Sequence, residues 1–134
     1  MTVIETKKGI SPNAIEKLYE FLVDMNNFEA LMPKDKIEKW SSTTEQCEFT
    51  IKGMARIGLK RIDQTSPTSI KIGSFGKVPF DFSLDIELKP VDDNHTETQM
   101  IFKGDINAFM KMMVEKPLTN FFNILVDKAA ELNL

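Results

Sequence analysis

Hydrophobic and polar positions alternate with a period of two through the middle of the chain, a pattern that predicts β-strands. The alternation is clearest over residues 80–88, where every second side chain is apolar and the intervening ones are Asp, Ser or Glu. Such a strand has one buried and one wet face, as antiparallel sheets allow. Less regular stretches predict further strands at residues 2–9, 37–41, 47–52, 55–60, 70–72 and 97–106.

Other segments show the helical spacing of apolar residues. Ser11 followed by Pro12 predicts the start of a first helix, because serine is a favourable N-cap and proline costs nothing at the first helical position. A second short helix is expected to stop at Pro33. The segment from about Ala108 to Leu132 predicts one long helix, and Pro117 should kink it by removing a backbone hydrogen bond.

This order of elements predicts an α+β fold. We expect a curved antiparallel sheet of six to seven strands, two short helices, and a long C-terminal helix packed on the concave face. A sheet with one apolar face must cover that face, and only the terminal helix is long enough to do so. A length of 134 residues, with no linker or repeat, predicts a single domain spanning residues 1–134.

Composition narrows the class of protein. Hydrophobic residues make up 42% and charged residues 28%, which is ordinary for a soluble globular chain. With 17 basic and 20 acidic side chains the net charge is −3, so the basic footprint of a nucleic-acid binder is missing. No apolar run reaches the ~20 residues of a membrane helix, and the N-terminus lacks the apolar core of a signal peptide. We therefore expect a cytoplasmic protein without an integral membrane segment; the sequence names no protein partner.

Few side chains suggest catalysis. His95 falls in a polar turn, where it is expected to be solvated. Cys47 stands on the apolar side of a predicted strand and should behave as a small buried hydrophobe. Asp81, Asp85 and Glu87 share the wet face of another strand, where exposed charges need no partner. With one histidine and one cysteine there is no zinc cluster, so we predict no catalytic residue, no metal site and no cofactor.

At this point the sequence resembles the START-like superfamily, also called SRPBCC or helix-grip, which includes the birch-pollen allergen type. Ile10-Ser11-Pro12 resembles its strand-to-helix transition, and residues 24–33 resemble its aromatic short helix that stops at a proline. Residues 53–59 look like its small bacterial members. The element order, which matches over essentially the whole chain, carries more weight than these degenerate motifs. The resemblance implies a seven-stranded sheet that grips the long helix around an apolar cavity.

Phenylalanine and methionine side chains predicted to face that cavity are the candidate ligand-binding residues. Methionine is flexible and polarizable, which suits a pocket whose contents vary, and ligand sites are mostly apolar with a few polar groups. An ordinary core would use the same residue types. The candidates are Phe49, Ile57, Phe80, Phe82, Met100, Phe102, Phe109, Met110, Met113 and Phe121.

Three functions are compatible with this sequence. Members of the superfamily bind lipids, sterols or polyketides, act as cyclases, or serve as chaperone partners. We therefore expect a binder of a small hydrophobic molecule, held between sheet and helix. A cyclase- or dehydratase-type enzyme acting on an apolar substrate is the first alternative, and it needs an ionisable group inside the cavity. A chaperone-activator-like interaction module is the second, and it predicts a filled core.

Overall fold

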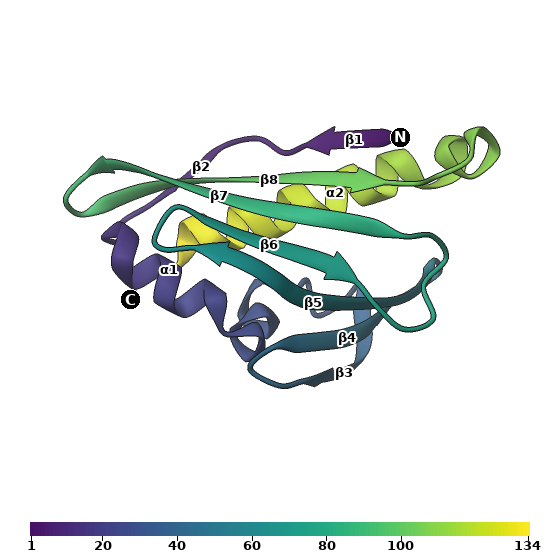
Figure 1. Cartoon of the computed structure of the whole chain (residues 1–134), viewed down its shortest axis with the longest axis horizontal. Helices are drawn as coiled ribbons and strands as arrows, with labels where there is room; N and C mark the ends of the chain where they lie inside the picture. Colours follow the sequence, from purple (N-terminus) through teal and green to yellow (C-terminus); the bar gives the residue numbers. More distant parts are fainter.

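Eight strands form an open, curved antiparallel sheet in the computed structural model, which describes residues 1–134 (Figure 1). The spatial order is β1-β8-β7-β6-β5-β4-β3, with β2 also paired to β8. This arrangement, together with the long terminal helix, confirms the predicted helix-grip class. The strands are β1 (Thr2–Glu5), β2 (Gly9–Ser11), β3 (Ile37–Ser42), β4 (Gln46–Ile51), β5 (Ala55–Thr65), β6 (Ser69–Ser74), β7 (Phe82–Asp92) and β8 (His95–Gly104).

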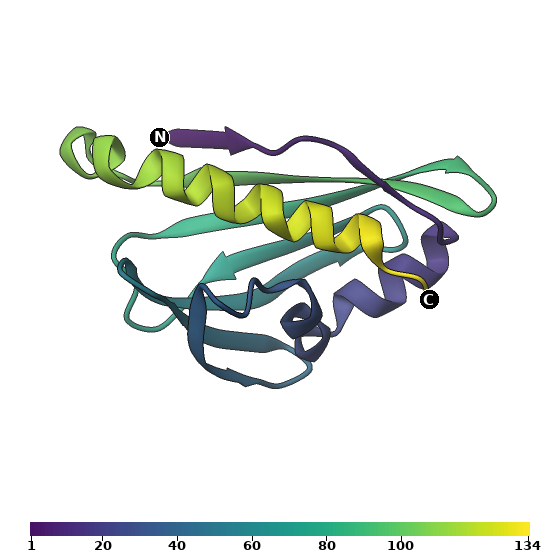
Figure 2. The ribbon, with the colours of Figure 1, turned by 180° about the vertical axis from the view of Figure 1, so that it is seen from behind.

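Three helices accompany the sheet: α1 (Ile15–Val23), the 3₁₀ helix η1 (Met25–Leu31) and α2 (Ala108–Glu131). Seen from behind the sheet, α2 runs diagonally across it, with α1 beside its C-terminal end (Figure 2). The inward-facing side chains of the sheet, helices α1 and η1, the adjoining loops and one side of α2 form a single core of 30 buried hydrophobic residues. Helix α2 contributes Leu118, Phe121, Phe122, Leu125, Val126 and Ala129 to this core.

The N-terminal strand predicted over residues 2–9 is two strands, and this accounts for the eighth strand. The regular ladder ends at Thr6, whose N–H still donates to the carbonyl of Met100 at 3.0 Å, while its hydroxyl accepts the backbone N–H of Met100 at 2.9 Å. The next residue, Lys7, leaves the sheet and donates its N–H to the side chain of Asn123 on α2 at 2.8 Å. The chain then rejoins β8 at Gly9, where an added Cβ would lie 3.0 Å from Val126 of α2. Glycine therefore permits the close approach of β2 to the helix.

The predicted start of the first helix is wrong by three residues. Ser11 is not its N-cap, because it pairs with Thr96 as the last residue of β2. Helix α1 begins at Ile15 after Ala14, and no side chain caps it. Asn13 instead joins distant segments: its side chain donates to the carbonyl of Leu132 and accepts the N–H of Leu134, both at 2.8 Å. Long-range pairing thus overrides a favourable local capping sequence.

Strand β3 lies at one end of the strand order and is irregular. Its register with β4 shifts between Glu38 and Ser41. Within this bulge Lys39 has a φ of 55°, in the left-handed region that non-glycine residues seldom occupy. The Lys39 carbonyl accepts a hydrogen bond from the guanidinium of Arg56 at 2.8 Å, which fixes the distorted segment to β5.

Helix α2 continues through Pro117, and its two parts differ in burial. The six buried residues all follow the proline, whereas the first turns carry exposed side chains. Phe109 and Met112 are 74% and 87% exposed. In Figure 2 these turns project beyond the sheet beside the N-terminus. None of the helices combines the length and apolar composition that crossing a bilayer requires.

Candidate functional site

Aromatic rings fill the space between the centre of the sheet and α2. Phe102 on β8 lies with its ring centroid 5.3 Å from those of both Phe82 and Phe122. Phe121 extends the cluster to Phe49, at 5.9 Å. The cavity that remains is about 10 Å³, room for at most one water molecule. Its walls are entirely apolar: Phe49, Ile51, Ile57, Leu59, Phe80, Phe82, Phe102, Leu118, Phe121 and Phe122.

An open groove of about 700 Å³ lies at the end of the same interface, beside the N-terminal half of α2. One wall is the helix; the other is the segment between η1 and β3 together with the β4–β5 turn. In Figure 2 the second wall lies below the first half of the helix. The groove is lined by Asp35, Lys36, Ile51, Lys52, Gly53, Met54, Met110, Met113, Val114, Pro117, Asn120, Phe121 and Ile124.

Backbone hydrogen bonds hold the wall opposite α2 in place. The N–H of Lys52 donates to the carbonyl of Lys36 at 2.9 Å, which ties the β4–β5 turn to the segment before β3. The turn closes with the N–H of Met54 donating to Ile51 at 3.0 Å. Gly53 takes a φ of 77° at its centre, a conformation that glycine adopts without strain. This short turn presents the Met54 side chain to the groove.

Phe121 and Ile51 line both the groove and the inner cavity, and they form the partition between them. Both side chains are at least nine-tenths buried. Phe121 is held by its contact with Phe49 and by an edge-to-face contact with Phe122, whose centroid lies 5.6 Å away. The inward extent of the groove is therefore set by the positions of the Phe121 ring and the Ile51 side chain.

The structure divides the ten candidate residues among five environments. Met110 and Met113 line only the groove, and Phe121 lines groove and cavity. Met100 is fully buried on β8 and lines neither space. Phe109 is exposed on the projecting turns of α2 and also lines neither. Those that line only the small inner cavity are Phe49, Ile57, Phe80, Phe82 and Phe102.

Most groove residues were not among the candidates, although the helical ones have a recognisable pattern. Met110, Val114, Pro117, Phe121 and Ile124 recur at helical spacing and form a second apolar stripe on α2, beside the stripe that packs on the sheet. The residues of the opposite wall give no such signal. They lie in short connections whose distance from the helix depends on the folded sheet.

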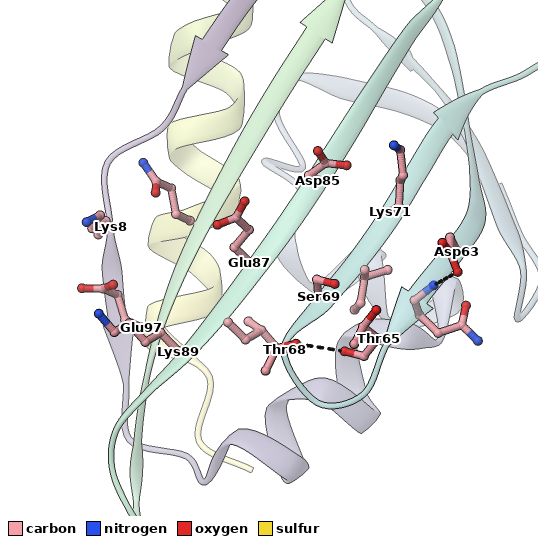
Figure 3. Close-up of a pocket in the computed structure, with 14 residues that line it drawn as sticks. Lys8, Asp63, Thr65, Thr68, Ser69, Lys71, Asp85, Glu87, Lys89 and Glu97 are labelled. Atoms are coloured by element: carbon pink, nitrogen blue, oxygen red, sulfur yellow. Dashed lines mark hydrogen bonds between the residues drawn. The ribbon is translucent and has the colours of Figure 1, made fainter.

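A second hollow, of about 670 Å³, lies on the outer face of the sheet over β5 to β8 (Figure 3). Only two of its 14 lining residues are hydrophobic, and both signs of charge are present. Asp85 stands opposite Lys71 in the β6–β7 register, yet one of its carboxylate oxygens is buried without a hydrogen-bond partner. Ligand sites are mostly apolar, so this polar trough is a weaker candidate than the groove.

Ionisable side chains elsewhere lie outside both apolar spaces. Burial, and then the charge of Glu48, raise the pKa of the Cys47 thiol to about 12, so the thiol stays protonated at neutral pH. The His95 ring lies 2.8 Å from the Asp92 carboxylate in an exposed turn, and this hydrogen bond lowers the pKa of Asp92. Of the polar side chains facing the groove, Asp35, Lys36, Lys52 and Asn120 are all exposed.

Comparison with solved structures finds the same architecture in proteins of very different sequence. A point mutant of norcoclaurine synthase of Thalictrum flavum, in complex with a transition state analogue, has a TM-score of 0.74 and 12% identity over 96% of this chain and 91% of that chain. A conserved protein of Geobacillus kaustophilus has a TM-score of 0.68, with 12% identity over 96% and 91%. A START superfamily protein of Mycobacterium smegmatis has a TM-score of 0.66, with 10% identity over 95% and 96%.

At the level of sequence, no protein-family model and no curated protein matches the chain. The likeness to solved structures nevertheless extends over nearly the full length of both chains in each comparison. It includes the curved sheet and the long C-terminal helix that covers it. The chain therefore has the START-like, or SRPBCC, helix-grip fold.

Proposed function

We propose that this protein binds a small hydrophobic molecule, of lipid, sterol or polyketide type, in the groove between the N-terminal half of α2 and the β4–β5 turn. The observation that carries the proposal is the groove itself: about 700 Å³ with seven hydrophobic side chains among its 13 lining residues. Ligand pockets have volumes of roughly 300–1,000 Å³ and mainly apolar walls. The START-like fold, generally a ligand-binding scaffold, supports the same function.

The packing of the core determines where such a ligand is placed. The inner cavity of about 10 Å³ excludes even a short hydrocarbon chain while Phe121 keeps its position. A ligand in the groove instead contacts Met110, Val114 and Ile124 on the helix and Met54 on the turn. Methionine side chains adapt to ligands of different shape, so this surface suits an apolar molecule without a rigid outline.

The same geometry bears on the two alternatives. A cyclase-type enzyme requires an ionisable group enclosed with its apolar substrate. The walls of the inner cavity supply none, and the three ionisable residues of the groove, Asp35, Lys36 and Lys52, are all exposed. An interaction module needs a filled core, which the aromatic cluster provides, but it does not account for an open apolar groove. The groove thus favours the binding function.

Titration with Nile red, a neutral apolar dye, tests the proposal. Met113 lines the groove with a 64% exposed side chain, so Met113→Trp should narrow the groove without disturbing the core. We expect the variant to bind the dye at least about tenfold more weakly, equivalent to 1.4 kcal/mol. Native mass spectrometry of freshly purified wild-type protein should also show a lipid-sized adduct.

Met112→Trp is the matched control, because Met112 is the neighbouring exposed methionine and does not line the groove. It should bind Nile red as the wild-type protein does. A wild-type protein that fails to bind Nile red, or a Met113→Trp variant with unchanged affinity, would contradict the proposal.

A further inference from the structure

The two walls of the groove differ in charge. The helix wall, from Met110 to Ile124, presents apolar side chains and Asn120 but no charged group. All charged lining residues lie on the opposite wall, where Lys36 and Lys52 accompany Asp35. Those three side chains give this wall a net charge of +1, in a protein whose overall net charge is −3. The groove therefore has an apolar side and a weakly basic side.

The two lysines are placed together by the backbone and are free to bind. The hydrogen bond from the N–H of Lys52 to the carbonyl of Lys36 makes their main chains neighbours. Neither ammonium group forms an ion pair within the protein. On the helix, by contrast, Lys111 is already paired with Glu115 at 3.6 Å. Lys36 and Lys52 thus supply cationic donors at the edge of an apolar surface.

We infer that the ligand is a single-chain amphiphile whose anionic headgroup, a carboxylate or a phosphate, binds Lys36 and Lys52 while its hydrocarbon chain lies against the Met110–Ile124 side of α2. This inference rests on the proposed function and names the ligand class of that groove. An ammonium group binds either oxyanion through charge-assisted hydrogen bonds, which are stronger than neutral ones. The hydrocarbon chain contributes through the burial of its methylene groups away from water.

The exposure of the two lysine side chains determines how much the anionic headgroup adds to the binding affinity. Both lysines are exposed, so each contact is screened by water and its contribution is modest. For two such contacts we expect decanoate to bind about five- to tenfold more tightly than decanol, which has the same chain length and no charge. High salt should reduce this preference, because mobile ions screen exposed charges.

The test compares decanoate, decyl phosphate and decanol by calorimetric titration at neutral pH, using three forms of the protein. The wild type is compared with the double variant Lys36→Gln/Lys52→Gln. The matched control is Lys71→Gln/Lys89→Gln, which changes the net charge equally but alters exposed lysines of the outer trough. Far-ultraviolet circular dichroism of each variant verifies that the fold is retained.

The inference is supported if decanoate or decyl phosphate binds more tightly than decanol and only the Lys36→Gln/Lys52→Gln variant loses that preference. The stronger of the two anions then identifies the headgroup. Equal binding of all three ligands, unchanged in the variant, overturns the inference but leaves the proposed function standing. If no ligand, decanol included, binds the wild-type protein, the proposed function fails and the inference fails with it.

Discussion

Replacing Phe102 by alanine should destabilise the protein without weakening ligand binding, because the ring belongs to the packed core and not to the groove. Phe102 is 1% exposed and lies 5.3 Å from the rings of both Phe82 and Phe122. Buried Phe→Ala substitutions cost about 3–5 kcal/mol through lost burial and the cavity left behind. Domains are typically stable by about 5–15 kcal/mol, so the variant should still fold at room temperature.

Urea denaturation followed by circular dichroism measures this loss directly. With a slope of ~1–3 kcal/mol/M for a small protein, the midpoint should fall by about 2 M. Phe109→Ala is the matched control, since Phe109 is 74% exposed and outside both apolar spaces. It should change the unfolding free energy by no more than about 0.5 kcal/mol.

Nile red titration of the folded Phe102→Ala variant then shows whether Phe102 serves only to pack the core or also contributes to ligand binding. Its affinity should match the wild type, because Phe102 does not line the groove. A cost below about 1 kcal/mol, or an equal cost at Phe109, would show that the aromatic cluster is not the packed centre described here. Loss of dye binding in a stably folded variant would place the ligand in the inner space instead.

Two further predictions concern single residues away from the groove. The side chain of Asn107 caps α2 by accepting the N–H of Met110 at 2.8 Å, so Asn107→Ala should weaken the first turn by about 1 kcal/mol. Hydrogen exchange at the Met110 amide should then quicken severalfold, and an unchanged rate would refute the capping role. Because burial raises the pKa of Cys47 to about 12, Ellman's reagent should leave the folded protein unmodified at mildly alkaline pH and label one thiol per chain in urea. Because the thiol pKa is higher in the folded protein than in the unfolded chain, the free energy of unfolding should fall as the pH rises from 9.0, the ordinary thiol pKa, toward 12. Rapid labelling of the folded protein would mean that Cys47 is accessible.

The periodicity of the chain was sufficient to predict the order of the longer elements, because their patterns are long enough to identify them, whereas the three-residue strand β2 was not predicted as a separate strand. Strand β7 and helix α2 both lie close to their predicted positions. Errors arose where residues distant in sequence decide the outcome. Ser11 has the local features of a helix cap, but its pairing with Thr96 places it in the sheet.

The site was less predictable than the fold. A sequence shows which side chains are apolar, but the space between them depends on how closely helix and sheet approach. Phe49 and Phe102 were reasonable candidates, and the structure places them around a cavity of about 10 Å³. The open volume instead lies where α2 passes the turn containing Met54, and 56 residues separate Met54 from Met110 on the facing wall. No local pattern encodes that distance.

The bulge in β3 also affects how the molecule behaves in concentrated solution. A regular strand at the border of a sheet offers free N–H and C=O groups to any second chain, and this is a common route to aggregation. Here the left-handed conformation of Lys39 interrupts that row, and its neighbour Glu38 adds an exposed charge of opposite sign. Strand β3 is therefore a poor template for intermolecular pairing. The sheet can keep this edge exposed without aggregating with other copies of the protein through it.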